Sequence, residues 1–156
     1  MYIALTLALV VCLVALAIEL RTKTIPNGLT VGALLLGPAL VTVLHGVVEA
    51  RQPSAWTIGD AYFQALGGAV FAVWIPYHLW RRNWLGGGAV KLTAAVAAIP
   101  CAMAIGFWMA VVWAAFGAFV WWARSRKTPG ASKTVPGAAI TLVAFALAAL
   151  VELARP

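Results

Sequence analysis

The sequence predicts an all-α integral membrane protein with roughly six transmembrane helices and the N-terminus outside. Of its 156 residues, 64% are hydrophobic and only 10% are charged. The apolar residues fall into segments of about helix-spanning length, and the Lys and Arg residues are confined to the short stretches between them. Because a bilayer core of about 30 Å needs about 20 apolar residues per helix, residues 1–156 form one transmembrane domain with almost no room for a soluble one.

The predicted spans are the apolar segments at about 2–18, 29–48, 61–80, 90–103, 104–123 and 135–151. The first should break before the second, because Pro26 disfavours helical backbone at the preceding residue and Asn27-Gly28 is a turn signal. The fourth begins within Gly86-Gly87-Gly88 and is short and rich in alanine. Such a segment suits a helix that is buried among other helices.

The basic residues set the expected orientation. The side with the loops after the first, third and fifth spans collects Arg21, Lys23, Arg81, Arg82, Lys91, Arg124, Arg126, Lys127 and Lys133, whereas the other side holds only Arg51 and Arg155. The positive-inside rule then predicts that these three loops face the cytoplasm. This places the stretch around Glu19 and the triple glycine on the same face. Since the charges follow the loops, we expect the lipid bilayer as a partner and no nucleic acid.

The sequence predicts neither a metal nor another cofactor. Cys12 and Cys101 lie inside apolar segments and have no CxxC spacing. Neither a zinc site nor a disulfide framework is therefore indicated, and both are expected to be packing residues.

Gly86, Gly87 and Gly88 are the first candidate for a site. Glycine permits positive φ and a close approach of backbone, and irregular backbone in a membrane protein is tolerated only inside protein or beside a watery cavity. The alternative is a flexible loop between two helices.

Glu19 is the second candidate, because an ionisable group at the end of an apolar helix is costly unless it is paired or used. It could form an ion pair with Arg21, Lys23 or Lys91. It could also be half of a carboxylate dyad, in which one acid holds a proton while the other activates water.

The run from Glu19 to Thr30 together with Gly86-Gly87-Gly88-Ala89-Val90-Lys91-Leu92 resembles the type IV prepilin peptidases, a family of intramembrane aspartic proteases. Lys133-Thr134-Val135-Pro136 extends the resemblance, which is to the short variety used for tight-adherence and Flp pili. It implies cleavage of prepilin leaders after a glycine, at the cytoplasmic face of the bacterial inner membrane, by two carboxylates without a metal. The prepilin signal-peptide helix would be the substrate, and the motif residues Pro26, Asn27, Gly86, Gly87, Gly88 and Lys91 would line its groove.

Longer members also carry a cysteine-bearing cytoplasmic domain associated with methyl transfer. The sequence lacks that pattern, so the resemblance does not imply N-methylation.

Both catalytic positions depart from the family pattern. Glu19 and Ala89 stand where the family has aspartates, and alanine can hold neither a proton nor a water. The remaining acids, Glu49, Asp60 and Glu152, are predicted on the opposite face, where Gly59-Asp60 imitates half of the motif and should cap a helix. We therefore expect an inactive peptidase, through an engineered or a natural replacement.

A non-catalytic assembly factor that binds prepilin signal helices is the alternative. A small transporter is disfavoured, because the spans contain almost no ionisable groups.

Overall fold

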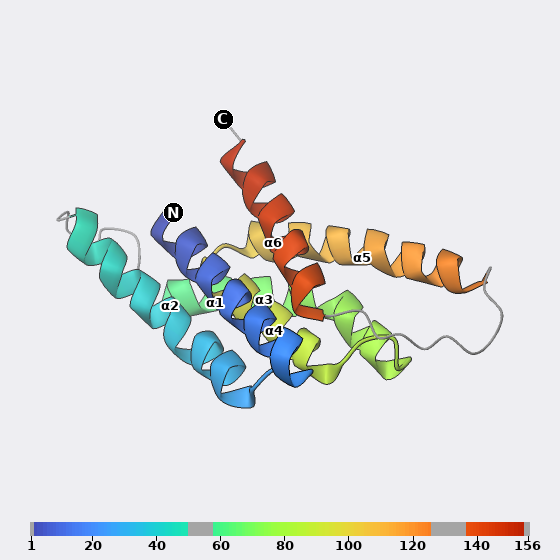
Figure 1. The fold of residues 1–156 in the computed structure, drawn as a ribbon. Helices are drawn as coiled ribbons and strands as arrows, with labels where there is room; N and C mark the ends of the chain where they lie inside the picture. Colours follow the sequence, from blue (N-terminus) through green and yellow to red (C-terminus); the bar gives the residue numbers. More distant parts are fainter. Residues whose placement is uncertain (1, 50–57, 126–136, 155–156) are drawn as a thin grey trace.

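The computed structural model describes residues 2–49, 58–125 and 137–154 (Figure 1). Within them the chain forms six helices: α1 (Tyr2–Thr22), α2 (Asn27–Glu49), α3 (Ile58–Arg81), α4 (Gly87–Ala98), α5 (Met103–Ser125) and α6 (Gly137–Leu153). The predicted all-helical class is confirmed for this part of the chain.

Three of the described helices are long and apolar enough to cross a membrane: α1, the Asn27–Leu44 part of α2, and the Met103–Val120 part of α5. α4 and α6 are apolar but shorter, with 12 and 17 residues. α3 has 24 residues but carries Asp60, Gln64, His78 and Arg81 among its apolar ones. These helices indicate a membrane protein.

α4 is the central helix and contacts every other helix (Figure 1). Leu92 and the run from Ala95 to Ala98 are buried, as expected for a segment rich in small residues. The predicted range 90–103 was wrong, however, because the helix ends at Ala98. Pro100 explains this end, since proline donates no backbone N–H and its ring clashes with a preceding helical turn.

The first helix extends further than the sequence suggested, to Thr22 rather than residue 18. The Thr22 hydroxyl donates to the Ile18 carbonyl at 2.9 Å, and the Lys23 amide donates to the Glu19 carbonyl at 2.8 Å. Glu19 therefore lies in the last turn of α1 and not in a loop.

α3 and α5 run parallel and pack through glycine. A side chain on Gly106 would overlap the backbone of Gly68, and a Cβ on Gly117 would lie 3.4 Å from Leu79. The two residues of each pair are separated by the same number of positions in the sequence. The same separation places Met103 beside Ala65, about 10 Å from the start of α3. The two helices are of similar length but staggered by roughly two turns.

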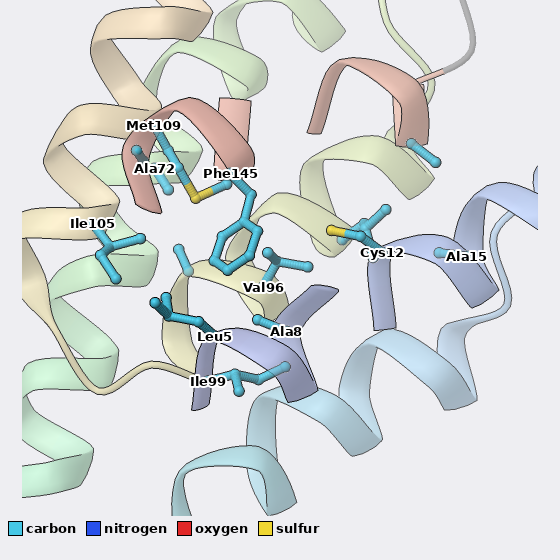
Figure 2. Packing of buried hydrophobic residues seen from close by; sticks show 14 of the residues in the cluster. Leu5, Ala8, Cys12, Ala15, Ala72, Val96, Ile99, Ile105, Met109 and Phe145 are labelled. Carbon is cyan, nitrogen blue, oxygen red and sulfur yellow. The ribbon is translucent and has the colours of Figure 1, made fainter. Parts of the chain in front are cut away.

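The main core joins four of the other helices to α4. Figure 2 shows Phe145 of α6 among Leu5 of α1, Val96 of α4 and Met109 of α5. Cys12 belongs to the same cluster, and both cysteines are buried and free, as packing residues would be.

Candidate functional site

Glu19 binds the start of α6. Its Oε1 accepts a hydrogen bond from the Gly137 amide at 3.1 Å, and its Oε2 accepts one from the Ala138 amide at 2.8 Å. The first amides of a helix lack intrahelical acceptors and lie at the positive end of the helix dipole, so a carboxylate is favoured there. Among the described residues, the partners of this carboxylate are amides and not Arg21, Lys23 or Lys91.

Ala89 contacts the same residue of α6. Any side chain on Gly137 would overlap the Cβ of Ala89, so the first turns of α4 and α6 are in direct contact. Ala89 is only 2% exposed and belongs to a cluster with Leu85, Trp113 and Ile140. Glu19 and Ala89 are thus separated by 70 positions in sequence but both contact Gly137.

Gly87 and Gly88 serve close packing, and none of the three glycines has a left-handed backbone. Gly86 precedes α4 with φ −72° and ψ 143°, which any residue can adopt. A Cβ on Gly87 would lie 3.3 Å from the Trp80 indole nitrogen, and one on Gly88 would lie 3.0 Å from the Cβ of Ile25. The expected close approach is present at Gly87 and Gly88, whereas the left-handed position nearby is Asn83, with φ 56°.

Pro26 and Asn27 lie beside the first turn of α4. The Lys91 ammonium donates to Oδ1 of Asn27 at 2.8 Å, which joins the start of α2 to α4. The Pro26 carbonyl accepts the Thr30 amide at 3.4 Å, so this proline leads directly into α2. Together with the contact between Ile25 and Gly88, these bonds bring the two motif segments side by side.

A buried pair of threonines lies one turn below Ala89 and Gly137. Thr93 donates to the Ala89 carbonyl at 2.8 Å, Thr141 donates to the Gly137 carbonyl at 3.0 Å, and the two hydroxyls are 3.0 Å apart. Two hydroxyl protons cannot serve all three hydrogen bonds at once. Sequence reasoning missed this pair and Gly137; each threonine does stand four residues after its partner, at the spacing of one helical turn.

The other described carboxylates lie far from Ala89. Asp60 is in the first turn of α3, and the neighbouring Ala61 and Ala65 pack against Ala98 and Cys101, beyond the far end of α4. The rise from Ala89 to Ala98 alone is about 14 Å. Asp60 is the third residue of its helix, so the prediction that it caps α3 was wrong by position, although an acid in a first turn is still favoured.

The remaining acids are Glu152 and Glu49. Glu152 lies in the last turn of α6, at the opposite end from Gly137. Glu49 ends α2, and its side chain is outside the described part of the chain, as is the segment Lys133-Thr134-Val135-Pro136. Among the described side chains, Glu19 is the one carboxylate at this end of α4.

The site as it stands therefore offers one carboxylate that is held by two amides, beside a buried methyl group. Glu19 and Ala89 both contact Gly137, but this end of α4 has one acid among the described side chains, and a single carboxylate cannot share a proton with a partner. Comparison of the chain with protein-family models, with curated proteins and with solved structures gives no match.

Proposed function

We propose that the chain is a membrane-embedded aspartic endopeptidase of the prepilin leader peptidase type whose catalytic pair is incomplete as written. The observation that carries this proposal is the meeting of Glu19 and Ala89 at Gly137. The motif segments around these positions, which the resemblance pairs, are also joined by the bond between Lys91 and Asn27.

In this function, the acids at positions 19 and 89 would share a proton and activate water for attack on the leader peptide bond. The chain lacks that second acid, and loss of one acid–base partner costs about 10²- to 10⁴-fold in rate. We therefore expect no measurable cleavage of a type IV or Flp prepilin by the chain as written.

A second candidate is a non-catalytic factor that binds prepilin signal helices during pilus assembly. Two observations favour it: the Glu19 carboxylate is already engaged by α6, and Ala89 is enclosed by apolar side chains. Both features suit a stable scaffold rather than an open catalytic pair.

The proposal includes six crossings of the bacterial inner membrane with both termini outside. It is supported by the three long apolar helices and by the gathering of Arg21, Lys23, Arg81, Arg82 and Lys91 near the ends of α1 and α3 and the start of α4. Introduced thiols at Ala154 and Asn83 test this topology. An impermeant reagent added outside intact cells should label A154C and not N83C, and the reverse labelling would overturn the orientation.

Repair of the acid pair tests the function. Leader cleavage in detergent should be absent in the parent, detectable in A89D and higher in E19D/A89D, because the misplacement of a catalytic group by about 1 Å can cost roughly 10²-fold. D60N in the repaired background is the matched control and should leave cleavage unchanged. Cleavage by the parent at the rate of the double variant would contradict the proposal.

A folded but inactive double variant would instead favour the binding candidate. That candidate has its own measurement, in which a photocrosslinker is placed in the prepilin signal helix. Capture of the parent chain, reduced by a substitution in the motif segments such as G88L, would support it. Failure to capture would exclude it.

A further inference from the structure

The turn between α4 and α5, residues 99–102, lies about halfway along two neighbouring helices. A Cβ on Gly37 of α2 would lie 2.7 Å from Ile99, and one on Gly68 of α3 would lie 3.0 Å from the Ala97 carbonyl and 3.4 Å from the Ala102 carbonyl. Each glycine is about 15 Å from the first residue of its own helix. With 23 and 24 residues, α2 and α3 are each about 35 Å long, so this turn is near the middle of that length.

The stagger of α5 leaves a cavity above this turn. Because α5 begins beside Ala65, the first two turns of α3 extend beyond the start of α5. A cavity of about 510 Å³ lies there and is lined by Asp60, Phe63, Gln64, Cys101, Ala102, Met103 and Ala104. We refer to this cavity as the notch.

Polar groups converge on the notch. Cys101 and Ala102 of the turn line it and α5 begins there, and the first amides of a helix lack intrahelical partners. The Gln64 side-chain oxygen accepts the Met103 amide at 3.4 Å, and Asp60 contributes a carboxylate to the rim. Irregular backbone at membrane depth is tolerated only inside protein or beside a water-filled cavity. Ile99, Pro100 and Cys101 of the turn are buried, whereas Ala102 and the first residues of α5, Met103 and Ala104, are half-buried, so protein leaves the α5 side of the turn open.

A second cavity of similar size offers a contrast. It lies between α3 and α5 and is lined by Val70, Phe71, Trp74, Ile75, Phe107, Ala110, Val111 and Ala114. All of these side chains are apolar, apart from the indole nitrogen of Trp74. Such a groove suits lipid chains, whereas the notch does not.

We propose that the notch holds water continuous with the aqueous phase beyond the start of α3, and that small hydrophilic molecules reach the turn between α4 and α5 through it. This inference depends on the chain being in a membrane. It does not depend on the peptidase function, and its test involves no prepilin.

The test compares two introduced cysteines at one depth. The offset between α3 and α5 places Ala104 of the notch level with Leu66, which is 65% exposed on the outer surface of α3 and lines neither cavity. A104C and L66C are reconstituted in liposomes, and a charged, impermeant methanethiosulfonate reagent is supplied on both sides. Both variants also carry C101A, because Cys101 itself lines the notch, and the C101A chain, whose remaining thiol Cys12 is buried, gives the background rate.

We expect A104C to react at least about 100-fold faster than L66C, because the charged reagent and the reactive thiolate are both strongly disfavoured in hydrocarbon. Equal rates well above the background would place this level of α3 outside the apolar layer and overturn the depth. Two background rates would mean a dry notch and overturn the proposal. If A104C fails to fold, A102C at the floor of the notch replaces it, with the same two outcomes.

Discussion

The two ends of α4 differ in how closely the protein surrounds them. At the N-terminal end, Gly87 and Gly88 allow Trp80 and Ile25 to approach, and polar groups are satisfied within the protein. At the C-terminal end the helix stops early, and the turn that follows it borders the notch. A carboxyl group at position 89 would therefore be enclosed, whereas the carboxylate of Asp60 is exposed. Gly88-Ala89 and Gly59-Asp60 therefore have different surroundings, with Ala89 buried between helices and Asp60 exposed.

The largest effect is expected where close packing excludes side chains. G137V should destabilise the fold by about 3 kcal/mol or more, because its Cβ would overlap Ala89 and neither helix backbone can yield easily. G86V is the matched control, since nothing lies within 4 Å of a Cβ at Gly86. Unfolding by denaturing detergent, followed by circular dichroism, measures both. Similar stabilities would contradict the tight contact between α4 and α6.

The next largest effect on stability is expected for Glu19, in contrast to Asp60 at the other end of α4. E19A should cost about 2 kcal/mol, because it leaves two α6 amides without a charged acceptor. E19Q should cost less, since the amide oxygen can still accept one bond. D60N at the exposed end should change stability by less than about 0.5 kcal/mol. An effect of D60N as large as that of E19A would erase the distinction between the ends.

The threonine pair should show a smaller, coupled effect. T93V and T141V should each cost about 1 kcal/mol, and the double variant should cost less than the sum. The reason is that two protons serve three hydrogen bonds, so one bond is already incomplete. Detergent unfolding of the four proteins in a double-mutant cycle measures this coupling. Strict additivity would mean that the hydroxyls do not interact.

The smallest effect is expected at the exposed link between the motif segments. K91M should cost about 0.5 kcal/mol, because the bond between Lys91 and Asn27 is accessible to water. K23M removes a similar exposed charge at the same end and is the control. If both variants are equally stable, this hydrogen bond contributes nothing to holding α2 against α4.

Much of the fold could be predicted from hydrophobicity. The helices lie close to the apolar segments, since few other structures satisfy the backbone of a long apolar run. The end of α4 was missed, although Pro100 marks it in the sequence. The stagger of α5 could not be predicted, because it depends on Gly106 fitting against the backbone of Gly68.

The site was predicted in part. Glu19, Asn27, Gly88, Ala89 and Lys91 were singled out, and they do lie at one end of α4. The partner of Glu19 could not be predicted from the sequence. The donors to its carboxylate are backbone amides of α6, and every residue type except proline has such an amide. Among the described residues, Glu19 binds these amides and not the basic residues considered as its ion-pair partners.

The shortness of α4 also bears on how the chain enters the membrane during synthesis. Its 12 residues extend about 18 Å, well under the roughly 30 Å of a bilayer core. It therefore cannot be held across the membrane as an independent segment while the ribosome is still adding α5. We expect α4 to reach its place only when α5 packs beside α3, so the helix at the centre of the molecule would be among the last to settle.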